Sequence, residues 1–455
     1  MVLDELGKRT NTIIDMIYVP TADQTTKRST MIAGGTPPDI FGADATTVIE
    51  FKKAGILANL TPYLTPQKAP NVLAESGNIL SLSPVNKDGI YMIFSERRAY
   101  APNLNLRTDW LRNLGMEMPT DLNSLYDVLY AFTYKDPDKN GKQDTFGLAV
   151  SMTGGYPFST IYGAYGIPSN NDYANRSFST IILDNGTLTT WVKHPQFLDA
   201  VTYIRRLIAD KLVEPDWATI TQMEMFGKLW NGVAGAIEFE CVGPTNNWMP
   251  GRYTERIPPT FGFPIIKGPQ GKHGVLKRFA SYMDGLVVSA KANVEAAIRI
   301  VDYCMSPDGS DLLYLGVEGV MYRWTDKTNG KFEYLGQYTD TATHRAAGGF
   351  CYNGLLTPFN NTGLRTLNKQ TQEGVAQAYA EGLDNTANII SVLKTRTDYG
   401  ADMDQIIVEM LAQLYTTTEN IRTVYDRYIR EWERAGGSAW EKEVNEAWIA
   451  QGRKG

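Results

Sequence analysis

Short apolar runs alternate with amphipathic segments over the first 60 residues of the chain. The run 13–20, IIDMIYVP, is rich in Ile and Val and predicts a β-strand. Residues 25–33 predict a helix, residues 39–41 a short strand after a Gly/Pro turn, and residues 46–55 a second helix. Because this alternation is typical of parallel strands joined by crossover helices, it indicates an α/β fold.

A longer helix with one apolar face is predicted within residues 118–132. Thr120 is its expected N-cap, since a hydroxyl there can accept a backbone N–H of the first turn. The side chains expected on its buried face are Leu122, Leu125, Tyr126, Leu129 and Phe132. Residues 194–212 repeat the pattern, with Pro195 where the first turn of a helix tolerates proline. Their buried stripe is formed by Phe197, Val201, Ile204 and Ile208.

The rest of the chain is predicted to be mainly helical. Asn293 and Ser306 each stand where a helix is expected to begin. Helix is also expected from about 402 to 428 and from 439 to 451, on either side of a Gly-Gly break. A chain of 455 residues is longer than one ordinary core accommodates, and no low-complexity linker divides it. We therefore expect two lobes, with the chain crossing between them more than once.

Composition excludes several classes of function. No run approaches the roughly 18 consecutive apolar residues of a membrane-spanning helix. The net charge of -6 argues against a nucleic-acid partner, which would need a basic face. The chain has no GxxxxGK[ST] or GxGxxG nucleotide motif and no GxSxG nucleophile elbow. Its three Cys and three His residues show no metal-ligand spacing, and Cys304 lies in an apolar helical pattern that indicates packing. By contrast, 25 Tyr and 9 Trp suit a cleft in which aromatic rings stack on sugars.

Six segments, in order along the chain, resemble one known family. They are GGTPPDIFGAD (34–44), LRTDWLRNLGMEMPTDLNSLYDVLYAF (106–132), DPDKNGKQDTFGL (136–148), LIADKLVEPDWATI (207–220), VDYCMSPDGSDLLYLGVEGVMYRW (301–324) and YIREWERAGGSAWEKEVNEAW (428–448). Together they resemble the family 1 extracellular solute-binding proteins of bacterial ABC importers. The closest type is the large Gram-positive lipoprotein of the carbohydrate-binding branch.

The resemblance implies an α/β, two-lobed periplasmic-binding-protein-like fold of type II, with a ligand cleft between the lobes and a helical C-terminus. It implies an N-lobe of residues 1–100 plus 285–318 and a C-lobe of 101–284 plus 319–455. The function that the resemblance implies is capture of an oligosaccharide by lobe closure, without catalysis. Oligosaccharides that contain uronate are among the implied ligands. The implied partners are the membrane permease subunits of the transporter. The expected protein is an extracellular monomer held at the cell surface by a lipid anchor that this sequence does not contain.

An acidic loop resembles the calcium loop of the same family. The residues with EF-hand spacing are Asp136, Asp138, Asn140, Lys142 and Asp144, with Lys142 offering its backbone carbonyl. Position 12, a bidentate Glu in an EF-hand, is Gly147 here, and Thr145 stands where relatives often supply a Glu. We therefore expect a structural calcium ion, bound more weakly or with water in its shell. The alternative is a solvated acidic turn.

The candidate ligand residues lie in turns, where side chains need not fill a core. Trp248 and Asn247 fall in the Gly/Pro-rich segment 242–252, and an indole is costly to display there unless it contacts something. Tyr156 lies on a Gly-rich loop, and Asp44 follows the predicted strand at 39–41. The alternative role of Asp44 is to cap the helix that follows.

Five more residues complete the candidate set. Tyr322 and Trp324 follow a helix near the expected cleft, although packing within a lobe would explain them equally. Tyr282 and Asp284 belong to a segment similar to the hinge strand, and Arg98, next to Arg97, would suit the carboxylate of a uronic acid. Trp110, Trp440 and Trp448 are expected in the core.

Two other functions stay open at this level. A glycosidase or lyase would have a similar composition, but it needs two carboxylates that face one bond, and no local pattern marks such a pair. A receptor for a peptide or another solute on the same scaffold is the second alternative, because a fold does not fix its ligand.

Overall fold

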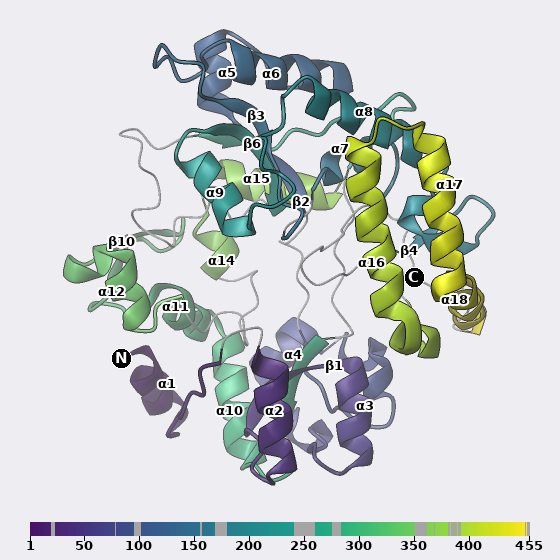
Figure 1. The fold of residues 1–455 in the computed structure, drawn as a ribbon. Coiled ribbons are helices and arrows are strands. Elements are labelled where there is room, and N and C mark those ends of the chain that lie inside the picture. The colour runs from purple at the N-terminus through teal and green to yellow at the C-terminus, as the bar shows by residue number, and fades with distance from the viewer. Residues whose placement is uncertain are drawn as a thin grey trace. The chain divides into compact units, whose positions relative to one another are not determined.

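A computed structural model of the chain describes residues 1–19, 23–77, 79–94, 102–154, 157–168, 180–240, 260–274, 284–350, 362–367, 369–380, 383, 389, 393–450 and 452 (Figure 1). These residues fall into two units. The first unit takes its described residues from 1–98 and 279–367, and the second from 99–246, 252–278 and 368–455. Each unit has a hydrophobic core of its own.

The first unit contains strands and helices from both ends of its sequence. Its helices are α1 (Val2–Thr10), α2 (Gln24–Ala33), α3 (Ala45–Lys53), α4 (Pro70–Ser76), α10 (Val294–Met305), α11 (Pro307–Leu315), α12 (Thr341–Ala346) and α14 (Thr362–Arg365). Its strands are β1 (Ile40–Asp44), β8 (Asp284–Val288), β9 (Tyr322–Asp326) and β10 (Lys331–Tyr334). Short 3-10 turns occupy Thr61–Tyr63, Leu80–Leu82, Pro84–Asn86 and Gly336–Thr339.

The centre of the first unit is the antiparallel pair β1 and β8, which pairs residues 40–44 with residues 284–288. Single bridges at Leu57–Ser289 and Ile93–Leu286 extend this ladder. Phe41, Val48, Val72 and Val287 are buried around it together with Ile298 of α10. The antiparallel register differs from the parallel pairing that the alternation of elements predicted, because β1 pairs with a strand that returns from late in the chain.

The predicted strand at 13–20 is wrong for the residues that the structure describes. Residues 12–19 form neither helix nor strand. Ile13 and Tyr18 are exposed, while Ile14 and Met16 rest partly on a small core. Ile and Val content favours a strand only where a neighbouring strand supplies hydrogen-bond partners, and no such ladder involves the described part of this segment.

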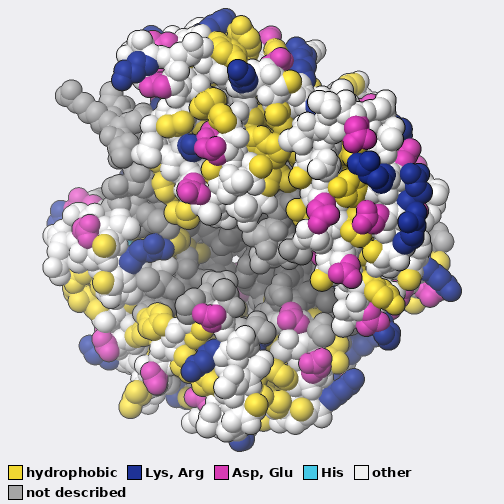
Figure 2. All heavy atoms as spheres, viewed as in Figure 1, with side chains coloured by type: hydrophobic (Ala, Val, Ile, Leu, Met, Phe, Trp, Pro, Cys, Tyr) yellow, Lys and Arg dark blue, Asp and Glu magenta, His cyan; other side chains and the backbone are white. Residues whose placement is uncertain are grey.

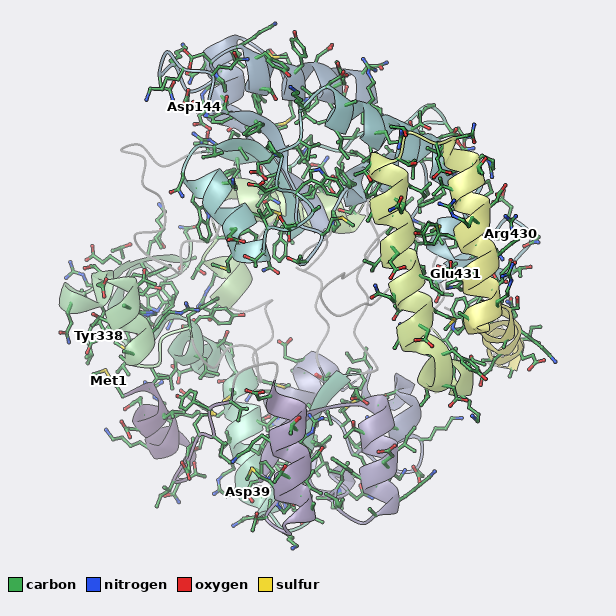
Figure 3. All side chains as sticks on the ribbon, viewed as in Figure 1. Met1, Asp39, Asp144, Tyr338, Arg430 and Glu431 are labelled. Carbon is green, nitrogen blue, oxygen red and sulfur yellow. The ribbon has the colours of Figure 1, made fainter. Side chains whose placement is uncertain are left out.

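Residues 319–350 belong to the first unit and not to the predicted C-lobe. The hairpin β9–β10 and helix α12 pack with α1 and α11 around Leu6, Cys304 and Met321. Val2 N donates to Ala347 O at 3.1 Å, and Tyr338 lies beside Met1 (Figure 3). The apolar contacts of α1 hold this segment where it is. Cys304 is buried, as its helical pattern predicted.

The second unit combines a four-stranded sheet with helices on its faces. Its helices are α5 (Thr108–Leu114), α6 (Leu122–Tyr134), α7 (Ser159–Ala164), α8 (Phe197–Ala209), α9 (Gln222–Trp230), α15 (Lys369–Ala380), α16 (Lys394–Thr416), α17 (Ile421–Trp432) and α18 (Ser438–Ala450), with a 3-10 turn at Trp191–Lys193. Its strands are β2 (Pro102–Arg107), β3 (Phe146–Ala149), β4 (Thr180–Ile182), β5 (Leu188–Thr190), β6 (Ala234–Glu240) and β7 (Phe261–Gly262).

The strand order in that sheet is β3-β6-β2-β7. β3 and β6 are parallel, and β2 is antiparallel to both β6 and β7. The antiparallel pair β4–β5 forms a separate hairpin. Parallel pairing, which the alternation in the first 60 residues predicted there, is found instead between β3 and β6.

Helix ends agree with local chemistry, with one correction. Asn293 and Ser306 cap α10 and α11 as predicted. The N-cap of α6 is Asp121 and not Thr120, because the Asp121 carboxylate accepts from Ser124 N at 2.8 Å and completes a capping box. The predicted helix 402–428 is two helices, since Asn420 caps α17 after a break.

The C-terminal helices α16, α17 and α18 pack on the core of the second unit. A π-helical turn at Glu433–Gly437 joins α17 to α18, and Gly436 there has a φ of 122°, which other residues rarely adopt. Trp110, Trp440 and Trp448 are all buried, so the prediction that they belong to the core is confirmed.

Candidate functional site

Two predicted ligand residues meet at one end of the central ladder of the first unit. Asp44 is the last residue of β1, Asp284 is the first residue of β8, and the register places them directly opposite one another. Asp39, labelled in Figure 3, precedes β1 at the other end of the strand. The fold therefore brings together two acidic residues that are 240 positions apart in the sequence.

The side chain of Asp44 is the N-cap of α3. Its Oδ1 accepts from Thr47 N at 2.8 Å, and its Oδ2 accepts from the Thr47 hydroxyl at 3.0 Å. The capping role that the sequence left open is thus confirmed. Asp44 is nevertheless exposed, and each carboxylate oxygen has a second lone pair, so the cap leaves acceptor capacity for the hydroxyl of a bound solute.

Tyr322 and Trp324 lie on β9 and pack within the first unit. Tyr322 is 1% exposed, and burial raises the pKa of its hydroxyl well above the usual value. Trp324 is half-buried, with the guanidinium of Arg365 4.8 Å from its ring centroid and the Phe332 ring at 6.0 Å. These contacts match the packing role that the sequence left open for both residues.

Arg365 also joins the hairpin to α11. Its Nη2 donates to the buried carboxylate of Asp311 at 2.5 Å, and burial raises the pKa of that carboxyl. The Trp324 ring is therefore held between the hairpin and an Arg365–Asp311 ion pair.

In the second unit, the carboxyl ends of β3 and β6 lie at one edge of the sheet, because the two strands are parallel. This edge is the usual ligand-binding side of an open α/β sheet. The segment that follows β3 is held there by two hydroxyls, since Ser151 Oγ and Thr153 Oγ1 donate to Ile220 O at 2.6 and 2.8 Å. We call this edge, with residues 150–154 and 157–160 and the end of β6, the carboxyl edge.

Glu238 is the residue of this edge that the sequence analysis missed. It lies on β6, is 1% exposed, and pairs across the sheet with Leu104. Its carboxyl accepts from Ser159 Oγ at 3.1 Å and from Thr160 N at 3.3 Å. Burial raises the pKa of the Glu238 carboxyl to about 8, although these hydrogen bonds oppose the change. The available signal was an acid in the middle of the apolar run AGAIEFE (234–240).

Five predicted ligand residues lie outside the described part of the chain. They are Tyr156, Asn247, Trp248, Tyr282 and Arg98. They stay predictions from the sequence.

The predicted calcium loop joins α6 to β3. The Asp136 carboxylate accepts from the backbone N–H groups of Asn140 and Gly141, both at 3.0 Å. The Asn140 amide nitrogen donates to Asp138 Oδ2 at 2.8 Å and to Asp144 Oδ1 at 3.2 Å. Three carboxylates thus converge on one turn around Asn140.

The acidic side chains of this loop repel one another. Burial, a hydrogen bond to Asp136 and repulsion by Asp144 raise the pKa of the Asp138 carboxyl. The oxygen-rich donor set is the kind that a hard divalent cation prefers. In the described part of the chain, no three His, Cys, Asp or Glu side chains are close enough to form a metal site as they stand.

Two neighbouring positions add no ligand to the loop. The Thr145 hydroxyl donates to Phe132 O at 2.7 Å, and Gly147 N donates to Thr133 Oγ1 at 2.9 Å. A Cβ at position 147 would lie 2.6 Å from Leu129 O, so no larger residue fits there. Neither position therefore adds a carboxylate to the five predicted residues of the loop.

Comparison with known proteins identifies the family. The family described as bacterial extracellular solute-binding protein matches residues 1–311, which is more than half of the chain. This chain belongs to that family. The resemblance that the sequence motifs indicated is therefore confirmed.

Two curated relatives extend over almost the whole solute-binding protein. Lipoprotein LipO of Bacillus subtilis (strain 168) is 25% identical over 97% of this chain and 88% of its own length. The polygalacturonan/rhamnogalacturonan-binding protein YtcQ of the same organism is 25% identical over 98% of this chain and 87% of its own length.

Solved structures show the same fold. FusA, an ABC-transporter substrate-binding protein of Streptococcus pneumoniae, has been solved in complex with kestose, and it matches with a TM-score of 0.71 at 18% identity over 100% of this chain and 96% of its own. A FusA EF-hand mutant in complex with fructo-nystose matches with the same TM-score at 20% identity over the same shares of the two chains. The predicted type II α/β solute-binding fold is confirmed.

The surface and the helices add two observations on the solute-binding protein. On the face in Figure 2, Lys and Arg side chains are interspersed with Asp and Glu side chains. Within the described ranges, no helix combines the length and apolar character that a bilayer crossing requires.

Proposed function

We propose that this solute-binding protein captures an oligosaccharide outside the cell for an ABC importer. The observation that carries the proposal is that relatives covering nearly the whole chain include YtcQ, named for binding polygalacturonan and rhamnogalacturonan, and FusA, a fructooligosaccharide substrate-binding protein. Membership of the solute-binding family supports the receptor role and the permease subunits as partners.

The proposed ligand contacts lie at two edges. In the first unit they are Asp44 and Asp284, whose residue type accepts hydrogen bonds from sugar hydroxyls. In the second unit they come from the carboxyl edge. Trp248, Asn247, Tyr156 and Tyr282 are the proposed aromatic and amide contacts, and Arg98 is the proposed partner of a uronate carboxylate. Two acidic residues at the Asp44 edge disfavour a carboxylate there, so a uronate ligand would place neutral hydroxyls at that end.

A thermal-shift screen tests the function directly. The purified protein is heated with kestose, with trigalacturonate and with maltotriose. A sugar that binds only the folded state raises Tm by an amount that grows with the logarithm of its concentration above Kd. A concentration-dependent rise with one sugar supports the proposal. If a wide panel of glycans leaves Tm unchanged while a peptide library raises it, the peptide-receptor alternative replaces the sugar-receptor proposal.

The role of Asp44 is separable from its capping role. Asp44→Asn keeps a good N-cap but removes the carboxylate, so we expect a loss of sugar affinity of about tenfold, the worth of one charge-assisted hydrogen bond, with little change in Tm. Asp340→Asn is the matched control, because Asp340 caps α12 with the same contact to Thr343 N, also 2.8 Å long. Equal affinities of the two variants would remove Asp44 from the site.

We further propose that the protein binds its sugar without chemical change. Family membership supports this, since the family consists of solute-binding proteins. Incubating the sugar that binds in the screen with micromolar protein, followed by chromatography, should return it intact. Release of shorter products by wild-type protein would favour the glycosidase or lyase alternative.

We also propose a structural calcium ion in the loop, held by Asp136, Asp138, Asn140, the carbonyl of Lys142 and Asp144. The convergence of three carboxylates and the EF-hand of FusA support this assignment. Calcium at 1 mM should raise the Tm of a chelator-treated sample and should not raise that of Asp138→Asn. Magnesium at the same concentration is the control, because it demands a near-ideal octahedral shell and gives up its bound water reluctantly.

Attachment of the protein to the cell surface through a lipid, and its monomeric state, complete the proposal. The relative LipO is a lipoprotein, which supports the first point. Sedimentation of the purified chain would test the second.

A further inference from the structure

The Glu238 carboxyl fastens strand β6 to the first turn of α7. Glu238 is almost completely buried, and both of its protein partners, Ser159 and Thr160, are the first residues of α7. The residue before them, Phe158, has a φ of 59° and is itself buried. The chain therefore enters α7 through a constrained position that the carboxyl group helps to hold.

The segment between β3 and α7 is held at its other end as well. Ser151 and Thr153 both donate to Ile220 O, and Met152 N donates to Trp217 O at 3.2 Å. The two attachments lie on either side of Gly154 and Pro157, which belong to the carboxyl edge. Releasing the Glu238 attachment would leave the segment held from one side only.

The surroundings of Glu238 favour its neutral form. Burial raises the pKa of the carboxyl to about 8. Among the described residues, the Tyr415 hydroxyl of α16 interacts electrostatically with Glu238, and burial raises the pKa of Tyr415 well above its usual value. The Tyr415 hydroxyl forms a hydrogen bond with the Tyr162 hydroxyl of α7. From β2 it meets Leu104, which carries no charge.

We propose that Glu238 is a positioning residue for solute capture, whose carboxyl group holds residues 157–160, at the start of α7, in place at the carboxyl edge. The proposal rests on the proposed function, since it assigns this edge to the binding of the solute. Glu238 acts through the segment that it holds and makes no contact with solute of its own.

Ionisation of Glu238 strengthens the hydrogen bonds that its carboxyl accepts, but the cost of burying the charge is larger, which is why the pKa is raised. A carboxylate without a cationic partner is costly to bury, so the charged form favours conformations in which the start of α7 opens to water. With a pKa of about 8, the neutral fraction falls roughly tenfold between pH 7 and pH 9. If only the neutral form binds, the apparent Kd rises by the same factor of about 10.

The first test needs no sugar. Hydrogen–deuterium exchange of a peptide covering 157–165 is measured from pH 6.5 to 9.5 and corrected for the intrinsic rate. Between pH 7 and pH 9 we expect protection to fall about tenfold in the wild type and to change less than twofold in Glu238→Gln, whose amide oxygen can accept the same hydrogen bonds. Glu238→Ala should be unprotected at every pH.

A second variant shifts the transition without touching Glu238. Ser159→Ala removes a donor that lowers the pKa of the carboxyl, so the pH at which protection falls should move upward. The control is Asp404→Asn, which removes another buried carboxylate of the second unit, paired with Arg396 at 2.6 Å. It should lower Tm and leave the pH profile of the 157–165 peptide unchanged. A profile identical in wild type, Glu238→Gln and Ser159→Ala overturns the proposal.

The second test measures affinity by calorimetry with kestose and trigalacturonate. The sugar that binds the wild type should lose about tenfold in affinity between pH 7 and 9, and less than twofold in Glu238→Gln. If the affinity of Glu238→Gln falls with pH as much as that of the wild type, the positioning role is overturned. If neither sugar binds any variant, the proposed sugar specificity fails, whereas the exchange experiment still decides whether Glu238 holds the segment.

Discussion

Gly235 of β6 lies against Phe132 of α6, and enlarging this glycine tests how tightly the second unit is packed. A Cβ at position 235 would lie 2.1 Å from Cδ2 and 2.7 Å from Cε2 of Phe132. Phe132 is completely buried, and its ring meets Trp110 edge-to-face with centroids 5.3 Å apart. The ring therefore cannot move away from an added methyl group without disturbing Trp110.

The cost of Gly235→Ala can be estimated from this geometry. An ordinary contact requires about 3.4 Å or more, so the ring must shift by over 1 Å into a filled core. Overpacking of this kind costs about 1–3 kcal/mol. For a unit of this size, each kcal/mol lowers Tm by about 2–4 °C, so we expect a fall of about 4–8 °C for a 2 kcal/mol cost.

The assay is a thermal melt of four proteins in a double-mutant cycle. Phe132→Leu alone should cost about 1–2 kcal/mol through lost packing. In that background the added methyl group has room, so Gly235→Ala should cost less than about 0.5 kcal/mol, and the two effects should be far from additive.

Gly227→Ala is the matched control, because Gly227 lies within α9 with only the Asn231 side chain near its Cβ position, at 3.9 Å. There the same substitution should stabilise the protein by up to about 1 kcal/mol, since alanine is the better helix former. Additive effects of Gly235→Ala and Phe132→Leu, or a Gly235→Ala protein as stable as wild type, would refute this account of the core.

Three further predictions concern single side chains. The pKa of Glu238 is higher in the folded than in the unfolded protein. Its contribution to stability is therefore fully present below about pH 4.5 and is lost as pH rises through about 8. In calorimetry, the Tm of Glu238→Gln should fall less than that of the wild type between pH 6 and 9. Asp109→Asn leaves the buried Arg107 guanidinium without its carboxylate, 2.6 Å away, and should cost about 2–4 kcal/mol in urea unfolding, whereas an effect below 0.5 kcal/mol would show that other partners suffice. Ser306→Ala removes the N-cap of α11 and should cost about 0.5–2 kcal/mol in the same assay, with Ser306→Asp restoring most of it.

Local chemistry is the part of the fold that the sequence predicts well. Ser306-Pro307 and Asn293 start helices because the cap and the first turn are decided within four residues. Thr120 was the wrong cap for α6 because Asp121, one residue later, also offers an oxygen at the right spacing. Pattern alone does not choose between two adjacent cap residues.

Pairing between distant segments is the part that the sequence predicts poorly. The run 13–20 has the composition of a strand, but a strand exists only where a partner offers its backbone groups. Residues 319–350 were assigned to the wrong lobe because their membership depends on apolar contacts with α1, about 320 positions away. Neither the lack of a partner strand for 13–19 among the described residues nor the contact of 319–350 with α1 can be predicted from the local sequence.

The residues of the candidate site also differ in how well the sequence predicts them. Asp44 was recognised because it follows a strand, but its position opposite Asp284 depends on β8 returning to pair with β1. Glu238 was missed because an acid in an apolar strand is unremarkable until the fold shows both faces of that strand covered and a helix start placed against the carboxyl. Residues that display a polar group in a turn can therefore be predicted from sequence, whereas residues that act by being buried in the right place cannot. A search of related solute-binding proteins for functional acids should accordingly begin with the ends of the sheet strands and not with the aromatic loops alone.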